Sequence, residues 1–517
     1  MLLLDLARAS AGVASTSSRL AKTDRVAQTL RAVGPGEVAV AAAYLSGELP
    51  QGSIGVGWAS LRDLPPAAAE PSLNILDVDA AFARLATTTG PGSQAARRAI
   101  LADLFGRATE EERGFLFALL MGELRQGALE GVMVEAVARA AGVAASEIRR
   151  AAMLAGDLRP VAVAALTEGR TGLARFRLTV LHPVRPMLAQ TAEDVGDAFD
   201  RLSASEGSPA GVDWKLDGAR IQVHRLDGEV RVFTRTLADV TARVPELVEV
   251  VAALPSPSMI LDAEAIALRP DQRPYAFQAT MSRFGTRLEK EGGRDVVLSP
   301  FAFDCLHLEG EDLIDRPAGE RFAVMSAVLP PELMVPRLVT GDRGEAATFF
   351  EDAVRRGHEG VMVKALDSRY EAGRRGASWL KVKRAHTLDL VVLAAEWGHG
   401  RRRGWLSNLH LGARDPQTGG FVMLGKTFKG MTDEVLAWQT RRFQELELSR
   451  DEYTVYVRPE LVVEVAFDGV QTSTRYPGGM ALRFARIKGY RPDKRPEDAD
   501  TIDTVRAIHD RGRMSTS

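Results

Sequence analysis

The first third of the chain places apolar residues with the period of amphipathic helices. In RATEEERGFLFALLMGELRQG, Thr109 and Glu112 have the spacing of a capping box, and FLFALL follows with its apolar positions on one helical face. Similar stretches surround this segment, so residues 1–183 are predicted to form an all-α domain. Pro183 and Pro186 in LHPVRPM interrupt the pattern, and we place a domain boundary there.

After this boundary the apolar positions alternate with period two. IQVHRLDGEVRVF alternates on both sides of Asp227-Gly228, which predicts a β-hairpin. Further strand-like runs are MILDAEAIAL, LSPFAFDCLHL and EGVMVKA, and helix-like pieces such as PELVEVVAAL and EAATFFEDAVRRG lie between them. Residues 184–385 are therefore predicted to form a mixed α+β domain.

Short strand-like runs dominate the remainder of the chain, among them LDLVVLAAEW, LHLGAR, FVMLGKTF and TVYVRPELVVEVAF. This pattern is typical of a small β-barrel, which we assign to residues 386–510. Residues 511–517, RGRMSTS, are expected to form a flexible tail. The predicted fold class is thus multidomain, with all-α, α+β and β-barrel parts in that order.

Composition narrows the class of protein. The chain has 517 residues, which corresponds to about three domains at roughly 150 residues each. Its net charge of −2 excludes a uniformly basic particle, although a local basic face would still allow nucleic-acid binding. A single cysteine, Cys305, excludes a disulfide within the chain and a zinc site made of cysteines. Because MLLLDLARAS is interrupted by charges and no long apolar run occurs, we expect a cytoplasmic protein without membrane contact.

One stretch of the barrel segment, GGFVMLGKTFKG, matches the pattern of a phosphate-binding P-loop from Gly420 to Thr427. A P-loop wraps its backbone N–H groups around a phosphate and continues directly into a helix. The residues between Gly420 and Gly425 are bulky and apolar, and Gly430 would break a following helix. We therefore interpret the stretch as a strand and expect any ATP site to lie elsewhere.

DWKLDGAR, from Asp213 to Arg220, places Lys215 directly before the predicted hairpin. A lone K-x-D-G pattern is common, and a surface strand ending in a turn would explain it. Its significance comes from the segments that follow it in order. These are Thr234-Arg235, LDAE, FAFDCLHLEG, EGVMVK, WLKVKR and LRFARIKGYRPDK.

In this order the segments resemble the motifs of the covalent nucleotidyltransferases, and most closely those of ATP-dependent DNA ligases. The N-terminal third resembles the helical DNA-binding domain of such ligases through TSSR, Thr16 to Arg19, and GELRQGALEGV, Gly122 to Val132. The resemblance covers nearly the whole chain and implies an adenylation domain followed by an OB-fold. It implies that AMP passes from ATP to a lysine and then to the 5′-phosphate of a nicked duplex, where the 3′-hydroxyl expels it.

The resemblance also assigns roles to single residues. Lys215 would be the nucleophile, which needs nearby positive charge or burial to lose its proton. Glu264 and Glu359 would hold Mg²⁺, with Mn²⁺ as a possible substitute, because hard oxygen ligands suit these ions. Phe303 would stack on adenine. The family usually has glutamate at the position of Asp213, whose shorter side chain still provides an acceptor. The further ATP-binding positions implied are Asp213, Arg220, Arg235, Glu264, Arg375, Lys381 and Lys383.

The basic segments of the barrel fit anionic partners. Arg483, Arg486 and Lys494 in LRFARIKGYRPDK are expected to meet the departing pyrophosphate, because developing charge must be met by positioned cations. GHGRRRG is either a DNA-contacting loop or a solvated one. We expect a monomer that surrounds nicked double-stranded DNA through phosphate contacts, with affinity that falls as salt rises.

Three alternatives are set against this hypothesis. An RNA ligase or a capping-type nucleotidyltransferase shares the lysine motif but does not usually carry such an N-terminal helical domain. A DNA-binding scaffold without activity predicts damaged motifs, whereas the lysine, both acids and the basic segments are all present. NAD⁺ is disfavoured as the nucleotide donor because the NAD⁺-dependent ligases carry a cysteine zinc finger, which one cysteine cannot form.

Overall fold

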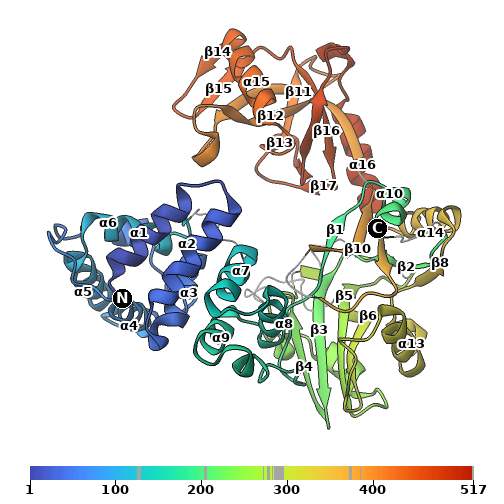
Figure 1. Ribbon diagram of the computed structural model, residues 1–517. Helices are drawn as coiled ribbons and strands as arrows, with labels where there is room; N and C mark the ends of the chain where they lie inside the picture. The colour runs from blue at the N-terminus through green and yellow to red at the C-terminus, as the bar shows by residue number, and fades with distance from the viewer. Residues whose placement is uncertain are drawn as a thin grey trace.

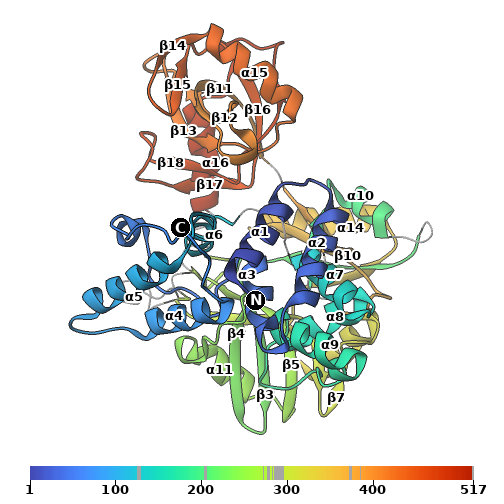
Figure 2. The same ribbon diagram turned by 60° about the vertical axis from the view of Figure 1, so that its left-hand side comes forward.

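The computed structural model describes residues 1–124, 130–202, 207–271, 273–275, 280–281, 283–284, 296–371, 375–384 and 386–514. Three regions follow one another along the chain: helices, a two-sheet domain and a barrel (Figure 1). The barrel, in orange and red, lies above the other two regions in this view and in the rotated view of Figure 2. The fold class predicted from the sequence is therefore confirmed.

The N-terminal region is helical, as predicted. Glu112 accepts a hydrogen bond from the backbone N–H of Thr109 at 2.8 Å, and the Thr109 hydroxyl accepts one from the backbone of Glu112, so the expected capping box is present. Phe115, Leu116 and Leu119 are buried in the core of this domain. Among the described residues, no helix has the length and apolar character needed to cross a bilayer. The helices are α1 (Leu3–Ala14), α2 (Arg19–Ala32), α3 (Val38–Ser46), α4 (Ile75–Thr87), α5 (Ser93–Arg107), α6 (Glu110–Leu120), α7 (Glu130–Ala141), α8 (Ala145–Ala155) and α9 (Leu158–Leu173).

The central region contains two sheets, with strand orders β1-β10-β9-β2-β8 and β4-β3-β5-β6-β7. The hairpin predicted at Asp227-Gly228 joins β3 to β4, and both residues have positive φ, as such a tight turn requires. The strands are β1 (Leu188–Thr191), β2 (Ala210–Lys215), β3 (Ala219–Leu226), β4 (Glu229–Thr234), β5 (Ser258–Ala267), β6 (Leu298–Leu308), β7 (Glu311–Asp312), β8 (Arg337–Thr340), β9 (Gly360–Ala365) and β10 (Arg375–Lys383). The helices that accompany them are α10 (Val195–Leu202), α11 (Pro245–Ala252), α13 (Ala318–Val328) and α14 (Arg343–Arg355).

The KLDG segment is the point where the chain crosses from one sheet to the other. β2 ends at Lys215 in the first sheet, and β3 begins at Ala219 in the second. A Cβ atom on Gly218 would lie 2.3 Å from the carbonyl oxygen of Ala265 on β5. Only glycine allows so close an approach, so this turn holds Lys215 at the junction of the two sheets.

The C-terminal region forms the predicted barrel. Its main sheet has the order β13-β12-β11-β15-β14, with β16 pairing with β11 and β19. The P-loop-like stretch is strand β13, paired antiparallel with β12, so its interpretation as a strand is confirmed. GHGRRRG contains a short 3₁₀ helix, Gly400–Arg402. The elements are β11 (His386–Trp397), β12 (Leu406–Arg414), β13 (Phe421–Thr427), α15 (Asp433–Glu445), β14 (Glu447–Arg450), β15 (Thr454–Val457), β16 (Val462–Phe467), β17 (Gly469–Thr472), β18 (Met480–Arg483), β19 (Arg486–Tyr490) and α16 (Ile502–Met514).

The expected domain boundaries fall in connections between elements. The boundary at 183 lies between the end of α9 and the start of β1, and the boundary at 385 lies between Lys383, the last residue of β10, and His386, the first of β11. The tail expected at 511–517 differs, because α16 continues to Met514, and residues 515–517 lie outside the described residues. The barrel is thus joined to the central domain by a very short connection.

Candidate active site

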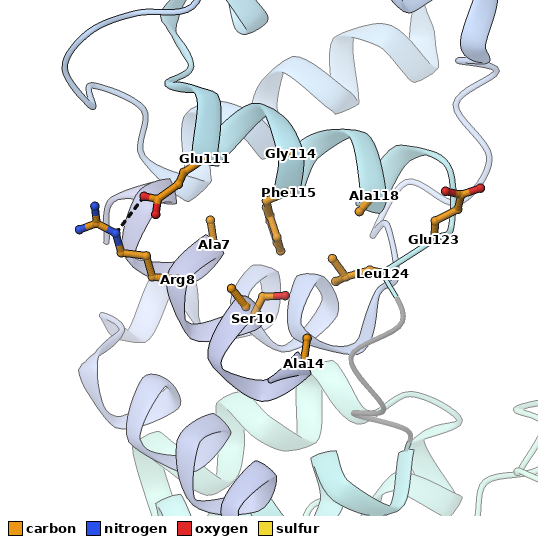
Figure 3. Close-up of a pocket in the computed structure, with 11 residues that line it drawn as sticks. Ala7, Arg8, Ser10, Ala14, Glu111, Gly114, Phe115, Ala118, Glu123 and Leu124 are labelled. Carbon is orange, nitrogen blue, oxygen red and sulfur yellow. Dashed lines mark hydrogen bonds and ion pairs between the residues drawn. The ribbon is translucent and has the colours of Figure 1, made fainter. Parts of the chain in front are cut away.

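Two of the cavities differ in their chemistry. One of about 460 Å³ lies between α1 and α6 and is lined mainly by small and apolar side chains such as Ala7 and Phe115, with the Arg8–Glu111 ion pair at one end (Figure 3). Another, of about 720 Å³, is lined by strands of both central sheets. It gathers most of the residues predicted from the sequence, namely Asp213, Lys215, Arg220, Arg235, Glu264, Phe303, Lys381 and Lys383.

Lys215 is held by an ion pair across adjacent strands. Its Nζ lies 2.5 Å from Oε2 of Glu359, and Nζ of Lys383 lies 2.8 Å from the same oxygen. The pairing of Lys215 with Gly360, the first residue of β9, places Glu359 beside the lysine. Burial would raise the pKa of Glu359, but Lys215 and Lys383 outweigh it and lower that pKa to about 2. Glu359 is therefore a carboxylate at neutral pH.

Two further acids, Glu264 and Asp217, lie near Lys215. Glu264 on β5 accepts a hydrogen bond from the backbone N–H of Gly218 at 3.2 Å. Burial raises the pKa of Glu264 to about 7, although Lys215 and Arg220 oppose the shift. Burial and the charge of Glu359 raise the pKa of Asp217 to about 6. The three carboxyl groups thus differ widely in how easily they ionise.

The acids around Lys215 could bind Mg²⁺ together with the nucleotide. Within the described part of the chain, no group of three or more His, Cys, Asp or Glu side chains forms a ready-made metal site. Mg²⁺ is commonly bound by one or two carboxylates together with substrate phosphates and water. Glu264 and Glu359 fit this kind of site, in which the nucleotide supplies the other ligands.

An aromatic and cationic group also lines the cavity. The Arg220 guanidinium lies 5.3 Å from the centroid of the Phe303 ring, and Trp379 meets that ring edge-on at 6.0 Å. Arg220 donates to both carboxylate oxygens of Asp262, at 2.9 and 2.6 Å. The Tyr370 hydroxyl donates to Asp262 at 2.7 Å. Arg220 and Phe303 therefore have fixed positions before any ligand arrives.

Asp213 has a different environment from the one expected. Its side chain is buried, with the residue 1% exposed, and Arg337 donates to it through Nε and, at 2.7 Å, through Nη2. Lys364 lies 2.6 Å from the same carboxylate. Burial would raise the pKa of Asp213, but these two cations lower it. The carboxylate expected to face adenine is thus the counter-ion of two cations.

The remaining predicted residues of the central domain lie along the cavity or at its margin. Lys381 and Lys383 are two residues apart on β10, so both face the cavity. Arg235 lines the cavity and is exposed. Arg375 begins β10, and its side chain lies outside the described residues.

Three barrel residues were predicted to meet the pyrophosphate, and two of them, Arg483 and Arg486, lie near the cavity. Arg483 lies 3.7 Å from Asp217, which is part of KLDG. Arg486 lies 3.5 Å from Asp468, and Asp468 lies 3.3 Å from Lys383. Lys494 is placed elsewhere: its Nζ lies 2.5 Å from Asp389 on β11, and Arg491 pairs with the same aspartate.

Four residues of the site were not identified from the sequence. Asp217 and Lys364 stand inside the quoted motifs KLDG and EGVMVK, so their motifs could have singled them out. Arg337 and Asp468 have no local signal. Arg337 is 124 positions from its partner Asp213, and only the folded sheet brings the two together.

Comparisons with known proteins agree with this arrangement. Residues 58–138 match the model of the DNA ligase N terminus, 186–383 the ATP dependent DNA ligase domain, and 402–494 the ATP dependent DNA ligase C terminal region. The chain is 62% identical over 515 residues to a probable DNA ligase of Anaeromyxobacter dehalogenans, with 98% of this chain and 100% of the relative covered. It is 61% identical over 514 residues to a probable DNA ligase of Mycolicibacterium gilvum, covering 99% and 100%. A solved structure titled Pmar-Lig_PreS3 has a similar fold, with a TM-score of 0.63, 19% identity, and 94% and 99% of the two chains covered.

Proposed function

Because the chain belongs to the family of ATP-dependent DNA ligases, we propose that it seals nicks in duplex DNA through a covalent lysyl-AMP on Lys215. The observation that carries this proposal is the position of Lys215 in a cavity shared with an ionised Glu359 and with Lys383. A nucleophilic lysine, a carboxylate and a cation on adjacent strands are what phosphoryl transfer to an amine requires.

In the first step, Nζ of Lys215 attacks the α-phosphorus of ATP. The N–P bond forms as the bond to the bridging oxygen breaks, and pyrophosphate leaves with the bonding electrons. The proton on Nζ must leave first, and the positive charge of Lys383, 2.8 Å from the carboxylate that Lys215 shares with it, favours this loss. Lys381 and Lys383 stabilise the charge that develops on the α-phosphate. AMP then moves to the 5′-phosphate of the nick, and the 3′-hydroxyl expels it.

The aromatic and cationic groups of the cavity bind the adenosine. Phe303 stacks on adenine, and Arg220, oriented by Asp262, meets the ribose. Asp213 acts on the base through Lys364, which it orients and which lines the same cavity. Arg235 and Arg375 are assigned to the nucleotide by the family motifs alone.

Mg²⁺, or Mn²⁺ in its place, would be held by Glu264 and Glu359 and would neutralise charge on the phosphates. Arg483 and Arg486 approach from the barrel and are assigned to the departing pyrophosphate. Lys494 would join them only by exchanging Asp389 for phosphate.

The DNA substrate is assigned to the face that the three regions share. A monomer whose helical region, central domain and barrel surround a nicked duplex would bind mainly through phosphates, with affinity that falls as salt rises. The cytoplasm, where ATP and chromosomal DNA meet, is the location that this function requires.

The first test is covalent labelling. With Mg²⁺ and ATP labelled at the α-phosphate, the protein is expected to take up label, and ATP labelled at the γ-phosphate should leave none. Lys215→Ala should abolish uptake. Lys426→Ala is the matched control, because Lys426 is the lysine of the P-loop-like stretch and pairs with Glu396 on the barrel. Label on Lys215→Ala, or its loss from a folded Lys426→Ala protein, would contradict the assignment.

The second test distinguishes the nucleotide and nucleic-acid substrates. The unlabelled protein is expected to seal a nicked DNA duplex bearing a 5′-phosphate when ATP is supplied, and not when NAD⁺ replaces ATP. Preferential sealing of a nicked RNA duplex would favour the RNA ligase alternative.

A further inference from the structure

An alternating chain of charges runs from the nucleophile into the barrel. Lys215 is 2.5 Å from Glu359, which is 2.8 Å from Lys383. Lys383 is 3.3 Å from Asp468, which is 3.5 Å from Arg486. The first three groups belong to the central domain and the last two to the barrel. Asp468 is therefore a carboxylate of the barrel that contacts a cation of the central domain.

The backbone fixes Asp468 close to the connection between the domains. Asp468 follows β16, whose last residue, Phe467, pairs with His386 at the start of β11. Its backbone N–H donates to the carbonyl of Arg483 at 3.0 Å, so the carboxylate is carried by a hydrogen-bonded part of the barrel. Its side chain is 23% exposed. A partly buried carboxylate in a fixed position holds cations better than one on a mobile surface loop.

We propose that Asp468 is a positioning residue that closes the barrel over the active site before ATP binds and then gives up its cations to the nucleotide. This inference rests on the proposed function, in which Lys383 and Arg486 contact the phosphates of ATP. The Asp468 carboxylate lies between these two cations, in the position that a phosphate of ATP would occupy. A second contact between the domains, Arg483 with Asp217, supports the same closed arrangement.

The charges around Asp468 indicate that it holds the barrel closed only while no triphosphate is bound. Lys383 and Arg486 face it, Glu359 lies on the other side of Lys383, and Asp217 pairs with Arg483. A bound triphosphate carries more negative charge than one carboxylate, so it competes successfully for the same cations and keeps the barrel closed by itself. After pyrophosphate leaves, the triphosphate no longer holds the cations, and the duplex phosphates compete with the single remaining carboxylate for them.

The experiment measures domain closure directly in the full-length protein. Cysteines introduced by Glu351→Cys on α14 and Arg441→Cys on α15 carry a donor and an acceptor dye, since both positions are exposed. Cys305 stays unlabelled because it is fully buried and burial raises the pKa of its thiol to about 12. Energy transfer is measured without nucleotide and with α,β-methylene-ATP and Mg²⁺, a nucleotide that cannot transfer AMP.

Three variants of the labelled protein separate the possibilities. Asp468→Asn removes the charge and keeps the shape, and Asp468→Glu restores the charge. Asp493→Asn is the matched control, because Asp493 pairs with Arg491 within the barrel. Without nucleotide, Asp468→Asn should lower the ratio of closed to open molecules about fivefold, the effect of one partly buried ion pair. Asp468→Glu should recover most of this loss, and Asp493→Asn should equal the parent.

The measurement with bound nucleotide distinguishes a contact that closes the barrel only without ATP from a general structural role of Asp468. With α,β-methylene-ATP, Asp468→Asn should return to the energy transfer of the parent, because the phosphates replace the carboxylate. Equal energy transfer in Asp468→Asn and the parent without nucleotide would overturn the proposal. Reduced transfer in both conditions would overturn it too, since it would mean a general packing role. Uptake of α-label by the parent protein is measured separately, so a failure of the proposed function is distinguished from a failure of this role of Asp468.

Discussion

Asp213 is held in a buried ionic group of the central domain. Its carboxylate forms ion pairs with both Arg337 and Lys364, and all three side chains are largely withdrawn from water. Removing one member of a buried ionic group leaves its partners charged without compensation, which costs more than the pair contributes when intact. The stability of the central domain should therefore depend strongly on this single side chain.

We expect Asp213→Ala to lower the free energy of unfolding by about 3–5 kcal/mol, the typical cost of stranding buried charges. Denaturant unfolding of the purified protein measures it. Asp352→Ala is the matched control, because Asp352 pairs with Arg355 and Arg356 on the surface of α14, where an ion pair contributes about 1 kcal/mol or less. Similar losses in the two variants would mean that Asp213 is not the buried counter-ion described here.

At the scale of elements, the turn between β2 and β3 determines where Lys215 lies. A methyl group on Gly218 would meet the carbonyl of Ala265 at 2.3 Å and the Glu264 side chain at 3.0 Å. Gly218→Ala should push β3 away from β5 and break the hydrogen bond from Gly218 to Glu264. A misplacement of about 1 Å can reduce a rate about 100-fold, and we expect a loss of this size in enzyme–AMP formation.

Labelling with α-labelled ATP checks this expectation. Gly36→Ala is the control, because a Cβ at Gly36 has no heavy atom within 4 Å. Near-parental labelling of Gly218→Ala would show that the turn tolerates a side chain and that glycine is not required there.

Strand β3 also carries a histidine that should link stability to pH. His224 is fully buried, its Nδ1 accepts a hydrogen bond from the backbone of Leu181 at 3.0 Å, and burial lowers its pKa to about 3. The unfolded chain binds this proton near pH 6.5, so the unfolded state holds more protons between pH 6.5 and 3. Stability from His224 is therefore complete above pH 6.5 and falls by about 1.4 kcal/mol per pH unit below it.

Unfolding measured from pH 7 down to pH 5 tests this linkage. His224→Gln keeps a polar side chain at the position and removes the titration, so its stability should decline less steeply with acid than that of the parent. His399→Gln, at an exposed position, should follow the parent. An unchanged slope in His224→Gln would place the acid sensitivity elsewhere.

Elements with local signals were predictable from the sequence, and long-range partners were not. The capping box at Thr109 and the hairpin at Asp227-Gly228 depend on residues a few positions apart, and both are present. The ordered motifs predicted Lys215 and Glu359 as parts of one site, and the structure brings them to 2.5 Å. Asp468, in contrast, meets Lys383 only because the barrel folds back over the central domain, so no local pattern could reveal the contact.

At the scale of the whole molecule, only two residues separate Lys383, the last residue of β10, from His386, the first residue of the barrel. Lys383 belongs to the catalytic cavity, and His386 begins the barrel sheet. A rotation of the barrel about this connection would move Arg483 and Arg486 toward or away from the cavity. Under the proposed function, the barrel would assist the departure of pyrophosphate and then turn away to let DNA approach.

This arrangement predicts that the two chemical steps separate in one variant. Pyrophosphate leaves only when enzyme–AMP forms, so a cation aimed at pyrophosphate matters only in that step. Arg486→Ala should slow formation of enzyme–AMP about 100-fold, the typical effect of removing one positioned group from a developing charge. It should slow sealing of a nick that already carries 5′-AMP by less than about threefold, because no pyrophosphate leaves there.

Single-turnover assays of the two steps measure this separation, and Lys494→Ala extends the comparison. Lys494 pairs with Asp389 on β11. If Lys494 exchanges that aspartate for phosphate, its variant should share the step-specific defect of Arg486→Ala. If the ion pair of Lys494 with Asp389 only stabilises the barrel, the variant should lose stability while both steps keep similar rates. Equal losses of both steps in Arg486→Ala would instead assign Arg486 to DNA binding, because phosphate contacts with the duplex serve adenylated nicks as well.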